Sequence, residues 1–225
     1  MLTEIARRAA VEFADTDAFV TEHGWAITYA ELDRAADEAA AGLADRGIGE
    51  GSVVALATPS NVDYVVAYLA AARLGAVTAG LNPRFTGAEL RSCLAVLAAD
   101  LVIASPELAE AMGPLDRPIA TVRPGSDAAT VAARFRTPGA GPAPTLAPDP
   151  ERPVCICFTS GSTGQPRGGW YANRQLQAIA DLDTGGAWGG GGHSLASGAR
   201  IEGNLTTNIE SVLNKIHEVL EHGKY

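Results

Sequence analysis

Short apolar runs alternate with helical patterns through the first half of the chain, and this alternation restricts the fold more than any other feature. The runs lie at 53–57, 76–81, 101–104 and 119–122, with helix-compatible stretches between them. Strands that alternate with helices pair in parallel, because a helical crossover returns the chain to the same end of the sheet. We therefore predict an α/β fold with a mostly parallel sheet flanked by helices.

The helical segments carry recognisable start and stop signals. Residues 3–14 and 28–44 place apolar side chains at helical spacing. Thr28 and Glu31 have the spacing of a capping box, and Arg46 with Gly47 supplies a C-cap. Further helices are predicted at 61–74, 86–97, from Pro106 onward and at 173–182.

A proline-rich connector divides this pattern from a second one. Residues 136–153 contain six prolines with Gly139 and Gly141 and have no periodic apolar pattern, which is typical of an exposed connector. An apolar strand is predicted at 154–158, directly before a loop rich in glycine, serine and threonine.

This loop, Thr159 to Gly168, has the chemistry of an anion site. Small residues between a buried strand and a helix expose backbone N–H groups and hydroxyls, which can donate hydrogen bonds to phosphate oxygens. Arg167 adds a fixed positive charge. The loop lacks the lysine and the glycine spacing of a Walker A motif, and the dinucleotide fingerprint is absent.

The order Thr-Ser-Gly-Ser-Thr-Gly-Gln-Pro-Arg-Gly closely resembles the signature of the adenylate-forming superfamily of acyl-CoA synthetases, luciferases and peptide-synthetase adenylation domains. The resemblance implies that the loop holds the β- and γ-phosphates of ATP while a carboxylate attacks the α-phosphate. It assigns this role to Thr159, Ser160, Gly161, Ser162, Thr163, Gly164 and Arg167.

Three other segments bear on the resemblance. Residues 27–32 and 69–83 look like family scaffold elements, and Asn82-Pro83-Arg84-Phe85 is more like acyl- and aryl-CoA ligases than peptide synthetases. Arg167 replaces the usual lysine and keeps its charge. Asn173 stands where many members carry a histidine whose segment borders the acyl pocket, so we assign it no catalytic role.

The resemblance covers residues 1–197 and implies that they form the N-terminal part of a ligase. The family's Mg²⁺-binding Glu, ribose-binding Asp and catalytic Lys lie downstream of these residues, so we assign no catalytic residue and no metal ligand. ATP, Mg²⁺, coenzyme A and a small-molecule carboxylate are expected of the full-length enzyme, and we expect this polypeptide to be inactive alone. A nucleotide-binding module without chemistry and a non-catalytic structural chimera are the alternatives.

Residues 198–225 differ in composition from the rest. Lys215 and Lys224 are the two lysines of the chain, whereas the arginines all lie at or before Arg200. We predict a foreign or appended tail whose residues 207–222 form a C-terminal amphipathic helix, after a segment, 185–192, too rich in glycine for a helix or strand. Its apolar face could support a homodimer.

Charge and composition exclude several other functions. The net charge of −9 and the absence of a basic cluster argue against a nucleic-acid partner. No apolar run approaches the length of a membrane span and the N-terminus lacks the order of a signal peptide, so we expect a cytoplasmic protein.

Cys155 and Cys157 alternate in an apolar run, which indicates reduced, buried thiols, since no second pair or nearby histidine completes a metal site.

Overall fold

The structure, a computed structural model, describes residues 2–21, 24–123, 130–137, 142–159, 166–181, 191–193 and 196–198. The chain separates into two compact units, Met1–Arg174 and Gln175–Tyr225. Across the described ranges, no helix combines the length and the apolar character that crossing a membrane requires.

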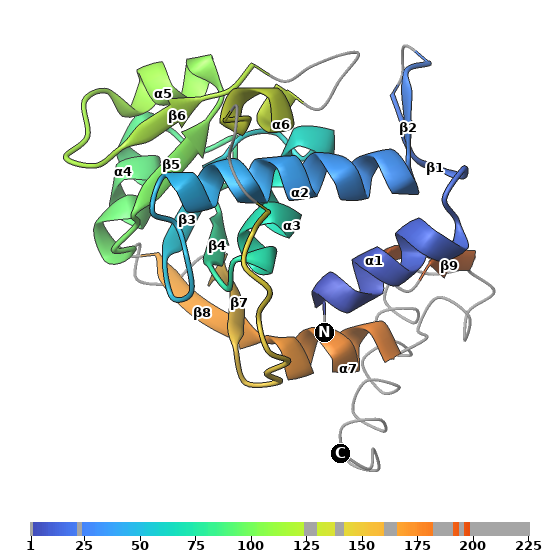
Figure 1. Cartoon of the computed structure of the whole chain (residues 1–225). Helices are drawn as coiled ribbons and strands as arrows, with labels where there is room; N and C mark the ends of the chain where they lie inside the picture. The colour runs from blue at the N-terminus through green and yellow to red at the C-terminus, as the bar shows by residue number, and fades with distance from the viewer. Residues whose placement is uncertain are drawn as a thin grey trace, which may run out of the picture. The chain divides into compact units, whose positions relative to one another are not determined.

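A six-stranded sheet with the strand order β6-β5-β3-β4-β7-β8 forms the centre of the first unit (Figure 1). The neighbours from β6 to β7 are parallel, and β8 pairs antiparallel with β7. The predicted parallel α/β architecture is confirmed. The strands are β3 (Val53–Ala57), β4 (Val77–Gly80), β5 (Leu101–Ala104), β6 (Ile119–Thr121), β7 (Pro153–Thr159) and β8 (Arg167–Ala172).

Helices cover both faces of the parallel strands (Figure 1). Val54 and Leu56 face a core shared with α1, α2, α3 and α6, whereas Ala55 and Ala57 face a core shared with α4 and α5. Strands buried on both faces need apolar residues at every position, which explains the continuous apolar runs in the sequence. The helices are α1 (Leu2–Glu12), α2 (Tyr29–Asp45), α3 (Val62–Arg73), α4 (Gly87–Val96), α5 (Pro106–Met112), α6 (Thr130–Phe135) and α7 (Asn173–Asp181).

The predicted helix boundaries are confirmed to within two residues wherever a cap marks them. Thr28 accepts from the backbone N–H of Glu31 at 3.2 Å while the Glu31 carboxylate accepts from the Thr28 N–H at 3.0 Å. Thr86 and Glu89 form a second capping box at the start of α4. Each box satisfies backbone donors that the first helical turn leaves unpaired.

Six elements differ from the sequence-based expectation. The sequence did not predict the hairpin of β1 (Asp17–Val20) and β2 (Ala26–Thr28), the helix α6, or the strand β8. Glycine at 191 and 192 was expected to prevent a strand, yet β9 (Gly191–His193) pairs antiparallel with β10 (Ala196–Gly198). Residues 182–190 and the predicted tail helix at 207–222 lie outside the described residues.

Candidate functional site

The Gly/Ser/Thr loop lies at the carboxyl end of β7. Thr159 is the last residue of β7 and Arg167 is the first residue of β8, and these two residues are partners in the β7–β8 register. Residues 160–165 of the predicted phosphate site lie outside the described residues. The loop therefore closes a β-hairpin at the edge of the sheet where the parallel strands end, which is where open α/β sheets bind ligands.

This geometry corrects the expected order of strand, loop and helix. β8 separates the loop from α7, so α7 does not begin directly after the loop. The backbone N–H groups of the loop and the exposed Arg167 remain as candidate phosphate donors. The sequence did not indicate β8, because the segment contains two glycines and its positions are almost all exposed. Trp170 and Tyr171, which favour strands, were its one local signal.

Parallel pairing and close packing hold β7 in place. Thr78 and Ala79 of β4 pair with Cys155 and Ile156 of β7, and the Thr78 hydroxyl donates to the Val154 carbonyl at 3.3 Å. At the start of β8, a Cβ on Gly168 would lie 2.8 Å from Cγ2 of Ile156. A Cβ at this position would force Ile156 or β8 to shift, so the glycine directly after Arg167 lets β8 pack closely against β7.

The structure corrects the expectation that both cysteines of β7 are buried. Cys155 is half-buried and Cys157 is exposed, whereas Cys93 of α4 is buried. The alternate residues, Ile156 and Phe158, pack toward the core under α4 and α5. The apolar run gave no signal of this exposure, because a run of this kind indicates burial on both faces.

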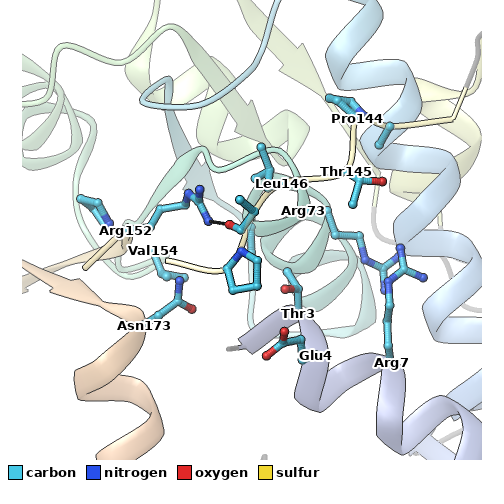
Figure 2. A pocket seen from close by; sticks show the side chains of 15 residues that line it. Thr3, Glu4, Arg7, Arg73, Pro144, Thr145, Leu146, Arg152, Val154 and Asn173 are labelled. Carbon is cyan, nitrogen blue, oxygen red and sulfur yellow. Dashed lines mark hydrogen bonds between the residues drawn. The ribbon is translucent and has the colours of Figure 1, made fainter. Parts of the chain in front are cut away.

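A pocket of about 490 Å³ lies at the opposite, amino end of β7 (Figure 2). Its walls come from α1, the end of α3, residues 143–148 of the connector and the start of β7, with Asn173 at one side. Three arginines, Arg7, Arg73 and Arg152, contribute to the lining. Arg167 is not among the lining residues.

The arginines of this pocket already have acidic partners. Arg73, whose side chain is 3% exposed, pairs with Asp33 and, at 2.9 Å, with Asp37. Arg7 donates to Asp37 at 2.8 Å. Burial lowers the pKa of Arg73, the charges of Asp33 and Asp37 oppose that change, and the hydrogen bond to Asp37 raises the pKa of Arg7.

The third arginine joins the connector to the turn before β3. Nε of Arg152 donates to the Glu50 carboxylate at 2.9 Å, and Nη1 donates to the Ala147 carbonyl at 2.9 Å (Figure 2). Because carboxylates neutralise these guanidinium groups, the pocket offers an anion little net positive charge. The arginines of the pocket therefore hold α1 and the connector in place.

Asn173 has a structural role at the amino end of β7. Its Oδ1 accepts from the backbone N–H of Leu2 at 3.2 Å, and its Nδ2 donates to the Asp149 carbonyl at 3.2 Å. The side chain is buried and lies a whole strand away from Arg167. In this chain, the position that resembles the family's histidine joins α1 to the connector.

The sequence profile of AMP-binding enzymes matches residues 6–187, which is most of the chain. The chain belongs to the AMP-binding enzyme family. It is 31% identical to a probable CoA ligase, CCL9 of Humulus lupulus, over 174 residues, or 74% of this chain and 33% of that protein. It is also 31% identical over 160 residues to surfactin synthase subunit 3 of Bacillus subtilis, covering 71% of this chain and 12% of that protein.

The fold agrees with this family membership. The inhibitor-bound N-terminal domain of FACL13 from Mycobacterium tuberculosis superposes with a TM-score of 0.68 at 26% identity, covering 81% of this chain and 47% of that one. The chain spans about a third of the length of the CoA ligase relatives that it matches. Both CoA ligases and peptide synthetases are among the relatives, so family membership by itself does not select between them.

Proposed function

We propose that this chain is the ATP-phosphate-binding part of a carboxylate-activating ligase. The observation that carries the proposal is the position of the Thr159–Gly168 loop, closed by a hairpin at the carboxyl end of a parallel sheet, in a chain of the AMP-binding family. Thr159, Ser160, Gly161, Ser162, Thr163, Gly164 and Arg167 would surround the β- and γ-phosphates.

The chemistry of such an enzyme has two steps. A carboxylate oxygen attacks the α-phosphorus of ATP, pyrophosphate leaves, and the thiol of coenzyme A then displaces AMP from the acyl-adenylate. The loop would hold the pyrophosphate portion in line with the attack, and Arg167 would offset the charge that develops on it. Mg²⁺, which binds phosphate oxygens and keeps several waters, would supply further charge neutralisation.

A CoA ligase is favoured over a peptide-synthetase domain by a local pattern. Asn82-Pro83-Arg84-Phe85 follows β4 at the same edge of the sheet as the loop, and its sequence is more like that of acyl- and aryl-CoA ligases. We expect a cytoplasmic enzyme that acts on a small-molecule carboxylate.

The 225-residue polypeptide taken alone would bind ATP without activating a carboxylate. About two thirds of the length of the CoA ligase relatives has no counterpart in it, and the resemblance places their catalytic lysine in that part. Lys215 and Lys224 belong to a tail of different composition and are poor substitutes.

A second candidate rests on that difference in composition. Residues 198–225 would be an appended segment, and the chain a structural chimera whose tail helix at 207–222 binds apolar surface of its own chain or of a second copy. Light scattering separates the two arrangements, because only the second doubles the mass in solution.

Calorimetric titration with ATP and Mg²⁺, together with carboxylate-dependent exchange of pyrophosphate into ATP, tests the proposal. We expect saturable binding and no exchange. Absence of binding would contradict the phosphate site, whereas measurable exchange would contradict the claim that the polypeptide alone is inactive. A variant that replaces Ser160, Ser162 and Thr163 with alanine should lose binding while its circular dichroism stays unchanged.

A further inference from the structure

The turn after β4 places an exposed arginine at the carboxyl end of the sheet. β4 and β7 are parallel neighbours, and Ala79 pairs with Ile156. Continuing that register by three residues brings Asn82 level with Thr159, the last residue of β7. Arg84 therefore follows β4 at the edge of the sheet where the candidate phosphate loop begins.

Local hydrogen bonds hold this turn in one shape. The Asn82 side chain accepts from the backbone N–H of Arg84 at 3.0 Å, and the Asn82 carbonyl accepts from the N–H of Phe85 at 3.0 Å. An asparagine that bonds the backbone two residues further on stabilises a tight turn. Phe85 packs against the core under α4 and α5, as Phe158 of β7 does. The backbone of Arg84 is therefore held beside the end of β7.

The Arg84 guanidinium is available to a ligand. Its side chain is exposed, and across the described ranges no carboxylate pairs with it and no carbonyl accepts from it. The acidic residue that follows in α4, Glu89, accepts instead from the N–H and the hydroxyl of Thr86, at 2.7 and 2.8 Å. The arginines of the pocket at the amino end of β7 differ, because each of them has a carboxylate partner.

Arg84 and Arg167 lie on opposite sides of β7. The neighbour of β7 on one side is β4, and its neighbour on the other side is β8, which begins at Arg167. Two strand spacings, about 10 Å, separate the two flanking backbones. A guanidinium on a long side chain can reach a phosphate from either side and bind it through two parallel N–H groups. A phosphate chain at the end of β7 would therefore lie between two cations.

We propose that Arg84 is a second phosphate-binding residue of the nucleotide site, on the side of β7 opposite Arg167. The inference rests on the proposed ligase function and extends it, because it assigns the polyphosphate of ATP to the space between the two arginines. A guanidinium offsets the charge that develops on departing pyrophosphate without transferring a proton. Arg84 would act on the phosphates and make no contact with the adenosine.

Calorimetric titration of the 225-residue chain with tripolyphosphate and with ATP, each with Mg²⁺, tests this assignment. We expect Arg84→Ala to lose about tenfold or more in affinity for both ligands, because hydrogen bonds to a charged group are lost. Arg34→Ala is the matched control. It removes the same charge from an exposed arginine of α2 for which the described part of the chain offers no partner, and its affinities should stay near those of the parent.

The outcomes separate this inference from the function on which it rests. Equal affinities in Arg84→Ala and the parent, or an equal loss in Arg34→Ala, would overturn the role of Arg84 while the parent still binds through its loop. A loss for ATP alone would also overturn it, because that result would place Arg84 at the adenosine. If the parent binds neither ligand, the proposed phosphate site and this inference fail together.

A second variant tests the position of Arg84 and keeps its charge. Asn82→Ala removes the acceptor of the Arg84 N–H and should weaken tripolyphosphate binding about threefold, because the turn no longer holds the arginine in place. In the Arg84→Ala background, Asn82→Ala should have no further effect, since its action passes through Arg84. An equal effect in both backgrounds would show that Asn82 acts independently and would overturn the proposed geometry.

Discussion

The two ends of β7 show how differently arginine can be used within one strand's length. At the amino end, a pocket contains Arg7, Arg73 and Arg152, and each of them meets a carboxylate. At the carboxyl end, Arg167 stands exposed beside a loop of small residues. The amino end therefore uses its arginines to hold α1 and the connector, whereas Arg167 at the carboxyl end is exposed beside the loop.

This difference teaches that exposure and position at the sheet edge indicate where an anion can bind, more than the number of cations or the size of a cavity. A guanidinium neutralised by two carboxylates stabilises the fold. A loop that presents backbone N–H groups beside one arginine at the rim of a sheet can serve a ligand. Mutations at the two ends should therefore separate stability from binding.

The largest expected effect is on stability, at the amino end. Arg73→Ala removes a buried cation and leaves Asp33 and Asp37 without its charge, which should cost about 3 kcal/mol in free energy of unfolding. Arg7→Ala removes an exposed partner of the same carboxylates and should cost about 0.5 kcal/mol. Urea denaturation measures both, and equal losses would contradict the distinction between buried and exposed pairs.

A smaller loss is expected for Asn173→Ala. Both of its side-chain hydrogen bonds disappear, which leaves the Leu2 N–H without this acceptor and the Asp149 carbonyl with the Arg152 N–H as its remaining donor, at a cost of about 2 kcal/mol. ATP affinity should not change. Reduced ATP affinity without a stability loss would instead place Asn173 at the ligand site.

The smallest effect separates two adjacent glycines at the carboxyl end. Gly168→Ala pushes a Cβ against Ile156 and should lower the free energy of unfolding by about 1 kcal/mol. Gly169→Ala meets open space and should be neutral or slightly stabilising. The thermal unfolding midpoints of the two variants check this. Equal midpoints would show that β8 can move away from β7 without loss of stability.

The parallel core could be predicted from sequence because several local signals agree there. Capping boxes at Thr28 and Thr86 start helices, and continuous apolar runs mark strands buried on both faces. The prediction failed where tertiary pairing outweighs local preference. β8 contains Gly168 and Gly169 and is almost wholly exposed, so its pairing with β7 has no periodic signature.

Only part of the candidate functional site could be predicted from the sequence. The order of residues in the loop indicates its chemistry, but the hairpin that closes the loop depends on the pairing of Thr159 with Arg167. The exposure of Cys157 depends on which faces helices cover, and the apolar run around it indicated burial. The arginine pocket joins α1, α3 and the connector, so no local pattern could predict it.

The most direct test compares ATP affinity in Arg167→Ala and Arg174→Ala by calorimetric titration. Arg167 is the first residue of β8, whereas Arg174 lies in the first turn of α7, beyond the other end of β8, and forms an exposed pair with Glu151. The substitutions change net charge equally, so general attraction for ATP falls equally in both. We predict about a tenfold or greater loss of affinity in Arg167→Ala, near-parent affinity in Arg167→Lys, and little change in Arg174→Ala. Equal affinities in the two alanine variants would contradict a phosphate site at the carboxyl end of β7.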